Sequence, residues 1–382
     1  MRKRTALRAF MGLVLSGLLV QEAFSAQLTR SADEMLKKLK LPPSILANVE
    51  KELQVPPEWL EKAKSEGPVR FLSTLEPKET KILFGVFSER YPTIQLTSTE
   101  ASREDRTVKT LVAYKSGRIL ADVIEGVGGT FYMFKEAKAL EDLRSIPTVK
   151  ALPAGTKDPD GLWAGTYRLN WCMSYNTKLV QREDLPRKWE DLFTRPRWKG
   201  GNLALINRPN LWVLQLWNAK GEQWTREFLT RLFTEIKPQL RKEGQSATIE
   251  LLGAGEFHAV VPSNPARTAQ KAQSGSPVGY FCPEPAPTSV NEAVILKGSP
   301  NIHGAKIFLN WLLSREGQIA LFAAHQATPV HKDLMRKEFI PFAEEIVGKE
   351  EAFRDPGLET ELLPKVFEVW NPLWMRAGGT AR

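Results

Sequence analysis

The chain has 382 residues with 53 Lys and Arg against 44 Asp and Glu, which gives a formal net charge of +9. Hydrophobic residues make up 42% and charged residues 25%, an ordinary globular composition that excludes a largely disordered chain. Two cysteines and four histidines exclude a disulfide-stapled mini-fold and a Cys-rich metal module, and leave little room for a histidine-built metal site. At roughly 100–200 residues per domain, this length predicts two domains.

Residues 1–25 have the pattern of a secretory signal peptide. A cationic start precedes an apolar run of 12 residues from Ala9 to Val20, and small residues follow near Ser25. That run is too short to cross about 30 Å of hydrocarbon as a helix, so cleavage is favoured over a membrane anchor. Residues 1–25 carry a net charge of +3, so the mature chain from about Ala26 would carry +6. This charge suits an anionic partner or simply solubility, and composition leaves both open.

The next part of the chain predicts helices and then an alternation of strands and helices. Residues 26–65 are expected to form a polar helical extension, punctuated by Pro42-Pro43 and Pro56-Pro57, that either wraps the following domain or contacts a partner. Three strand–helix alternations follow, which is typical of a parallel sheet with helices on both faces. The strands are expected at Val69–Ser73, Thr93–Thr97 and Ile119–Ile124, and the helices at Pro77–Tyr91, Arg106–Ser116 and Phe131–Leu143.

The middle of the chain predicts a second α/β unit. It begins with a long aromatic, strand-like stretch at Leu162–Tyr175. Further strands are expected at Leu203–Ile206, His258–Val261, Val278–Cys282 and Val290–Leu296. Further helices are expected at Asp184–Phe193, Trp212–Ala219, Glu222–Leu240, Thr248–Ala254, Ala305–Leu313 and Glu316–Ala324, followed by a mostly helical tail. The fold class predicted from these patterns is α/β.

Six short motifs, in order over residues 57–335, resemble one protein family. They are Trp59–Gly67 (WLEKAKSEG), Phe87–Pro92 (FSERYP), Ala113–Val123 (AYKSGRILADV), Ser174–Lys178 (SYNTK), Asp184–Leu192 (DLPRKWEDL) and Asn310–Gln318 (NWLLSREGQ). Each is weak alone, but together they resemble bacterial extracellular solute-binding proteins of ABC importers. More narrowly, they resemble the type 2 periplasmic-binding fold, in the subgroup that holds ferric-iron, thiamine and phosphonate binders.

The resemblance implies two lobes, each a mostly parallel sheet flanked by helices, joined by two crossover segments at a hinge. Lobe one would comprise residues 66–168 and 285–382, and lobe two with its crossovers residues 169–284. The crossovers would be Leu169–Ser174 and Tyr280–Glu284, which places Cys172 and Cys282 on neighbouring segments. An oxidising periplasm makes a disulfide between them plausible, and two buried free thiols are the alternative.

Candidate ligand-binding residues lie in the turns that follow strands, because ligands of open α/β sheets bind beyond the carboxyl ends of strands, near helix N-termini. Arginines there could clamp an anion through bidentate hydrogen bonds, and tryptophans could stack on a ligand. The alternatives are plain N-caps, solvated arginines and core tryptophans. The candidates are Ser73, Thr74, Ser102, Arg103, Gly128, Gly129, Trp171, Tyr175, Asn207, Arg208, Asn210, Trp212, Ser263, Asn264 and Arg267.

The predicted ligand is a small organic anion, namely a phosphonate, sulfonate or carboxylate. The iron binders that the sequence resembles use two adjacent tyrosines after the strand that matches His258–Val261, where this chain has Pro262-Ser263-Asn264 and no Tyr-Tyr pair. The alternatives are a ferric-iron receptor with atypical ligands or, in a different class, a periplasmic enzyme on the same fold. Against an enzyme, the sequence contains neither H-E-x-x-H nor G-x-S-x-G.

The resemblance therefore predicts an exported, periplasmic and monomeric receptor that is not an enzyme. Its lobes would close on a small-molecule ligand, and the closed form would dock on the membrane permease of an ABC transporter. No cofactor and no metal are expected. No nucleic-acid partner is expected either, because the chain is exported and lacks a concentrated basic stripe.

Overall fold

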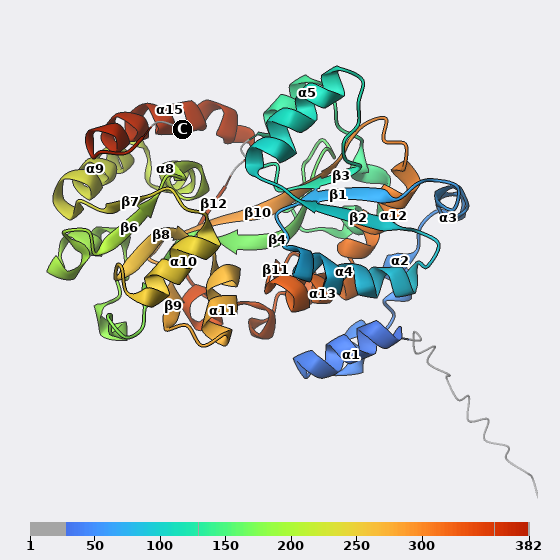
Figure 1. Ribbon diagram of the computed structural model, residues 1–382, viewed down its shortest axis with the longest axis horizontal. Helices are drawn as coiled ribbons and strands as arrows, with labels where there is room; N and C mark the ends of the chain where they lie inside the picture. Colours follow the sequence, from blue (N-terminus) through green and yellow to red (C-terminus); the bar gives the residue numbers. More distant parts are fainter. Residues whose placement is uncertain (1–27, 129, 355, 381–382) are drawn as a thin grey trace, which may run out of the picture.

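The computed structural model describes residues 28–128, 130–354 and 356–380, so the predicted signal peptide at residues 1–25 lies outside the described residues, as does Gly129. Two lobes lie side by side, each built around one β-sheet with helices on its faces (Figure 1). The α/β, two-lobed architecture predicted from the sequence is confirmed. Within the described ranges, none of the helices combines the length and the apolar character that crossing a membrane requires.

Lobe one contains a seven-stranded sheet in the order β11-β4-β10-β3-β1-β2, with β12 paired to β10. Its centre is the predicted alternation, in which β1 lies parallel to both β2 and β3. Antiparallel pairs appear where β10 joins β3 and β4. Strand β4 leads the chain into lobe two, and β10 returns it to lobe one. The strands are β1 (Val69–Ser73), β2 (Leu96–Glu100), β3 (Val123–Glu125), β4 (Ala164–Asn170), β10 (Ala286–Ile295), β11 (Thr328–Pro329) and β12 (Glu351–Phe353).

The helices of lobe one cover both faces of this sheet. Helix α4 begins with Pro77 at its first position, where the missing N–H costs no helical hydrogen bond. Phe87 of α4 packs edge-on against Phe308 and Trp311, which joins α4 to α12. These helices are α4 (Pro77–Arg90), α5 (Thr110–Lys115), α6 (Phe131–Glu136), α7 (Pro147–Ala151), α12 (Ile302–Leu312) and α13 (Arg315–His325).

Lobe two contains a five-stranded sheet in the order β7-β6-β8-β5-β9. Here β6 lies parallel to β7 and β8, whereas β5 runs antiparallel to β8 and β9. The strands are β5 (Cys172–Asn176), β6 (Leu203–Ile206), β7 (Gln239–Arg241), β8 (Ala259–Ser263) and β9 (Val278–Phe281). The helices are α8 (Val213–Lys220), α9 (Glu222–Arg231), α10 (Gln245–Ala254) and α11 (Pro265–Gln273).

Two adjacent crossovers connect the lobes, from β4 to β5 and from β9 to β10. Cys172 and Cys282 form a disulfide between them, with 5.0 Å between the two Cα atoms. The buried hydroxyl of Tyr280 accepts a hydrogen bond from the Cys172 amide and donates one to the carbonyl of Asn170. Backbone, side-chain and covalent links therefore hold the two crossovers together at the hinge.

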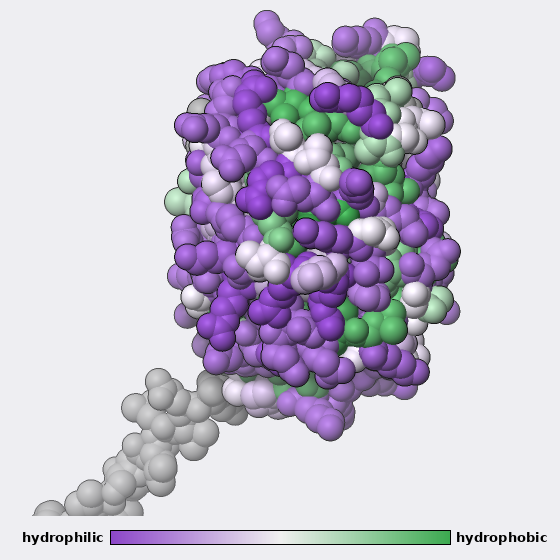
Figure 2. All heavy atoms as spheres, turned by 90° about the vertical axis from the view of Figure 1, so that its left-hand side faces the viewer, coloured by the Kyte–Doolittle hydropathy of each residue, from purple (hydrophilic) through white to green (hydrophobic). Residues whose placement is uncertain are grey.

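The C-terminal helix α15 (Pro356–Arg376) packs on lobe two, against α8 and α9 (Figure 1). This corrects the predicted assignment of all of residues 285–382 to lobe one, since only the part through β12 belongs to the first sheet. The physical reason is aromatic packing, because Trp370 lies against Phe233 and Trp212 of lobe two. The end of the molecule formed by lobe two is mainly hydrophilic, with apolar residues in small separate patches (Figure 2).

The N-terminal extension packs on lobe one, which decides between the two roles that the sequence left open. Helix α1 (Arg30–Leu39) lies against α4 and α13, below them in Figure 1. Helix α3 (Pro57–Ala63) lies against α12. The short helix α2 (Glu50–Leu53) lies between α1 and α3 in the chain. Leu36 and Leu46 are 1% exposed and belong to the main hydrophobic core, so the extension completes that core.

Candidate functional site

A cavity of about 350 Å³, which we call the interlobe cavity, lies between the lobes at the carboxyl ends of their strands. This volume suits a small-molecule ligand. From lobe one its lining includes Thr74, Ser102, Arg103, Arg106, Gly126, Gly128, Tyr167, Asn291, Glu292 and His325, and Trp171 lies on the crossover from β4 to β5. From lobe two it includes Arg208, Asn210, Gln245, Asn264 and Arg267, and Arg354 lies between β12 and α15.

Nine of the residues predicted from the sequence line this cavity, namely Thr74, Ser102, Arg103, Gly128, Trp171, Arg208, Asn210, Asn264 and Arg267. Their contact with a ligand stays a prediction. Some also have structural roles: Asn264 caps α11 by accepting a hydrogen bond from the Ala266 amide at 2.9 Å. The indole Nε1 of Trp171 donates to Ser289 Oγ across 3.0 Å, which fixes its ring at the cavity wall.

Three small polar or aromatic candidates lie outside the lining and hold the backbone or sheet instead. Ser73 is fully buried, and its Oγ accepts a hydrogen bond from the Leu75 amide at 3.1 Å. Ser263 hydrogen-bonds Ser174 across 2.6 Å, within the second sheet. The ring of Tyr175 packs edge-on against Phe281, also within lobe two. These are corrections to the predicted site, because strand-end position alone does not decide which way a side chain points.

Two further candidates also lie outside the lining, and both anchor α15. Asn207 Oδ1 accepts a hydrogen bond from Trp370 Nε1 at 2.9 Å. Trp212 is fully buried and packs against Trp189, Phe228 and Trp370, so it is a core residue. Gly129, the remaining candidate, lies outside the described residues.

The most informative cavity residue that the sequence did not single out is Arg106. Its side chain is buried, and its guanidinium donates from Nη1 to the Ala101 carbonyl and from Nη2 to the Gly126 carbonyl at 3.3 Å. Nε finds no partner among the described residues, and burial lowers the pKa of the guanidinium. Gly126, with φ +79°, permits this approach, since a Cβ there would lie 3.3 Å from Nη2.

Arg106 belongs to a π-helical turn, Asp105–Lys109, that immediately precedes α5. Such turns are frequent at functional sites, because the extra residue re-aims side chains. The sequence showed only a helix beginning near Arg106, and helical periodicity does not reveal a single wide turn. The sequence pattern therefore predicts a helical residue at this position and not a residue of the site.

Behind Arg106 lies a fully buried carboxyl group, that of Glu125 at the end of β3. Its Oε1 accepts a hydrogen bond from Thr166 Oγ1 at 2.8 Å, whereas Oε2 has no partner among the described residues. Burial raises the pKa of Glu125 to about 7, although the positive charge of Arg106 opposes this. Asn291, which lines the cavity, also has an amide nitrogen, Nδ2, without a partner in this part of the structure.

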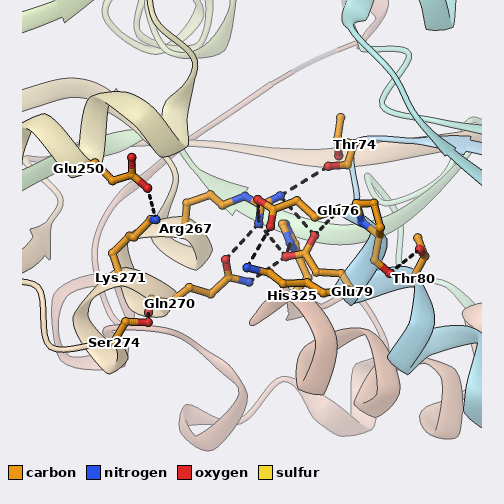
Figure 3. Close-up of polar contacts among 12 residues, drawn as sticks. Thr74, Glu76, Glu79, Thr80, Glu250, Arg267, Gln270, Lys271, Ser274 and His325 are labelled. Carbon is orange, nitrogen blue, oxygen red and sulfur yellow. Dashed lines mark hydrogen bonds and ion pairs between the residues drawn. The ribbon is translucent and has the colours of Figure 1, made fainter.

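Two other arginines of the cavity, Arg354 and Arg267, are neutralised by carboxylates. Arg354 lies 2.7 Å from Glu292 of β10 and also pairs with Glu359 of α15. Burial favours its neutral form, but these two carboxylates raise the pKa of Arg354 far above its ordinary value. Arg267 of α11 reaches across to lobe one, where it meets Glu79 at 2.6 Å (Figure 3). Arg106 differs, since no carboxylate in the described ranges forms an ion pair with it.

Across residues 28–128, 130–354 and 356–380, there is no group of three or more His, Cys, Asp and Glu side chains that could hold a metal ion. Tyr167 lines the cavity, but burial raises the pKa of its phenol, which opposes the phenolate form that a ferric ion prefers.

Two curated relatives share part of the sequence. An uncharacterized protein of Haemophilus influenzae is 31% identical over 150 residues, 36% of this chain and 40% of the relative. Iron uptake protein A1 of a Synechocystis species is 29% identical over 199 residues, 47% of this chain and 53% of the relative. The chain thus spans about half the length, or less, of the curated relatives it matches.

Solved structures match the fold over nearly their whole length. Iron-bound HitA from Pseudomonas aeruginosa has a TM-score of 0.66 at 17% identity, covering 80% of this chain and 99% of HitA. The periplasmic binding protein AfuA from Actinobacillus pleuropneumoniae, with fructose-6-phosphate bound, has a TM-score of 0.66 at 19% identity, covering 81% and 98%. At these identities the likeness supports the fold alone, which is the two-lobed type 2 periplasmic-binding fold.

A sequence model of bacterial extracellular solute-binding proteins matches residues 120–348, which include most of both lobes and both crossovers. The match covers more than half of the chain. The chain therefore belongs to the bacterial extracellular solute-binding protein family.

Proposed function

We propose that this protein is an exported, monomeric, periplasmic receptor that captures a small organic anion between its lobes and delivers it to the permease of an ABC transporter. Residues 1–25 serve as its signal peptide, and the lobes meet at crossovers near residues 169–174 and 280–284. Phosphonates, sulfonates and carboxylates are the ligand classes that we propose. The protein acts by binding and not by catalysis.

The observation that carries this proposal is the environment of Arg106. Its guanidinium is buried at the interlobe cavity, is hydrogen-bonded by backbone carbonyls, and has no ion-paired carboxylate within the described ranges. A buried charge is costly unless it is paired, and a ligand anion would supply the pairing. Arg103 and Arg208, which line the same cavity from the two lobes, place further positive charge around the bound anion.

A ferric-iron cargo is the second candidate, because relatives named for iron uptake and iron binding are among the matches. The described side chains favour an organic anion, since they offer arginines and amides where a ferric ion needs several anionic oxygens. The sugar phosphate bound to AfuA belongs to the same broad class of organic anions, which supports including phosphate esters in a screen.

The test is a thermal-shift screen of the mature protein against phosphonates, sulfonates, carboxylates, phosphate esters and ferric citrate. A ligand at a hundredfold excess over its Kd stabilises the folded form by about 2.7 kcal/mol, which raises Tm by several degrees. We expect one anion class to shift Tm, and Arg106→Gln to weaken that ligand about 10- to 100-fold. Arg118→Gln, an exposed arginine of the same lobe, is the matched control.

A shift with ferric ion alone, retained in Arg106→Gln, would contradict the organic-anion assignment. Chemical conversion of the bound compound, measured by mass spectrometry, would contradict the assignment as a receptor without catalytic activity. Mass spectrometry of the freshly purified, denatured protein identifies any ligand that co-purifies, so a missing shift in the screen is not mistaken for a missing site.

A further inference from the structure

We propose that the polar cluster around Glu79, which we call the interlobe latch, closes the two lobes even without ligand. The interlobe latch consists of Glu76, Glu79 and His325 of lobe one together with Arg267 and Gln270 of lobe two (Figure 3). Its consequence for ligand affinity rests on the proposed function, whereas its consequence for lobe closure does not.

The central contact is a two-pronged ion pair between residues 188 positions apart in the sequence. Arg267 Nη1 lies 2.6 Å from Glu79 Oε1, and Nη2 lies 3.3 Å from Oε2. Gln270, one turn further along α11, donates to Glu79 Oε1 at 2.9 Å. Charge-assisted, two-pronged pairs of this kind are the strong and geometrically specific ones.

Lobe one holds Glu79 ready for this contact. The residue occupies the first turn of α4, and its Oε2 accepts a hydrogen bond from the Glu76 amide at 2.8 Å, which satisfies an otherwise unpaired N–H. His325 of α13 contacts Glu79 Oε1 through Nδ1 at 3.0 Å. None of these contacts involves lobe two, so the carboxylate keeps its position when the lobes separate.

Burial makes both charged partners necessary for the closed arrangement. Glu79 is fully buried, and Arg267 and His325 are 8% and 2% exposed. Removing one partner of such a pair leaves the other as an uncompensated buried charge, which is strongly unfavourable. In an open arrangement water solvates each group, so the same substitution has little effect there. The interlobe latch therefore shifts the open–closed equilibrium instead of merely stabilising one lobe.

The geometry also changes the role predicted for Arg267. Its guanidinium is already occupied by Glu79, by Glu76 at 3.1 Å and by Gln270. A ligand anion in the interlobe cavity thus meets an arginine whose charge is balanced, so Arg267 closes the lobes instead of clamping the ligand. Apparent affinity scales with the fraction of protein in the binding-competent state, so a latch that populates the closed form raises affinity without touching the ligand.

The experiment measures lobe closure in the ligand-free mature protein. Both native cysteines are in the disulfide, so Ser116→Cys on lobe one and Lys242→Cys on lobe two provide two thiols for fluorescent labels. We expect Glu79→Gln and Arg267→Gln each to lower the closed-to-open ratio at least about tenfold, as seen by energy transfer and a larger scattering radius.

Glu316→Gln is the matched control, because Glu316 is also fully buried and paired with an arginine, Arg90 at 2.6 Å, but within lobe one. It should lower thermal stability and leave lobe closure unchanged. Equal closure in the wild type, Glu79→Gln and Arg267→Gln would overturn the interlobe latch, and so would equal opening in Glu316→Gln. Gln270→Ala keeps every charge and should lower the closed-to-open ratio partially. An unchanged ratio in Gln270→Ala would also count against the interlobe latch.

This measurement uses no ligand, so it is independent of the ligand screen. If no organic anion binds but the lobes open in Glu79→Gln, the proposed function fails and the interlobe latch stands. If an anion binds but lobe closure is insensitive to Glu79, the receptor stands and the interlobe latch fails.

Discussion

The indole Nε1 of Trp370 donates a hydrogen bond to Asn207 Oδ1 across 2.9 Å, which fastens the C-terminal helix to the turn after β6. The ring of Trp370 is fully buried, with its edge against Phe233 at 5.4 Å between ring centroids and against Trp212 at 6.4 Å. Helix α15 is therefore a built-in part of lobe two, although it follows a strand of lobe one.

We expect Trp370→Ala to lower the free energy of unfolding by about 3–5 kcal/mol, because a large buried ring leaves a cavity when removed. Trp370→Phe retains a buried aromatic ring but loses the N–H donor and part of the ring volume, so its cost should be smaller, about 1–3 kcal/mol. Urea denaturation of the two variants measures both values. Equal stability of Trp370→Ala and the wild type would contradict the packing of α15 on lobe two.

Asn207→Ala separates a structural role from the ligand role that the sequence predicted. Because Asn207 holds Trp370 and lies outside the interlobe cavity lining, we expect a loss of about 1–3 kcal/mol in stability. Ligand affinity, measured by calorimetry with whichever anion the screen identifies, should stay within about twofold of wild type. A large loss of affinity with unchanged stability would restore the original prediction.

The sequence predicted the two-lobed fold, because strand–helix alternation and local motifs are properties of short segments. It predicted much of the cavity lining, because strand ends in an α/β sheet converge on one edge. It missed Glu79, since the partner that makes it important, Arg267, is 188 positions away. It missed Arg106, since one wide helical turn has no periodic signature, and it misplaced α15, since an aromatic face does not reveal which lobe it covers.

Reduction of the Cys172–Cys282 disulfide should destabilise the protein without unfolding either sheet. The bridge closes a loop with a sequence separation of 110, and loss of such a cross-link typically costs about 2–5 kcal/mol through the entropy of the unfolded chain. Urea titrations with and without dithiothreitol measure this difference. The Cys172→Ser/Cys282→Ser variant should match the reduced protein and ignore dithiothreitol, and a reductant effect that persists in this variant would contradict the assignment.

Substitutions in the N-terminal extension should behave as core substitutions. Leu36 on α1 is 1% exposed and packs with the core of lobe one, so Leu36→Ala is expected to cost about 2–5 kcal/mol. Lys38→Ala, an exposed position on the same helix, should stay within about 0.5 kcal/mol of wild type. Thermal denaturation measures both variants. A neutral Leu36→Ala would mean that α1 docks too weakly to contribute to the core and would favour a role in contacting a partner.

The buried carboxyl of Glu125 should make stability fall as pH rises through neutrality. Its pKa is about 7 in the folded protein against an ordinary value of 4.5. Below the ordinary value both states are protonated and the group has no effect. Between the two values only the unfolded state releases its proton, so unfolding becomes easier as pH rises. Above about pH 7 the penalty is constant at roughly 3 kcal/mol, since a tenfold change in proton affinity is worth about 1.4 kcal/mol.

Glu125→Gln removes this titration and keeps an oxygen for the hydrogen bond from Thr166, so it should be more stable than wild type at about pH 8 and similar at about pH 5. Glu79 should change stability with pH in the opposite direction, and Glu79→Gln removes its titration. Burial favours the protonated form of Glu79, but His325 and Arg267 lower the pKa of its carboxyl to about 2. Glu79 therefore stabilises the protein above about pH 4.5, and this contribution is lost toward pH 2. Chemical denaturation across this range distinguishes the two groups, and a Glu125→Gln curve parallel to wild type between about pH 5 and pH 8 would show that Glu125 is already ionised within the fold.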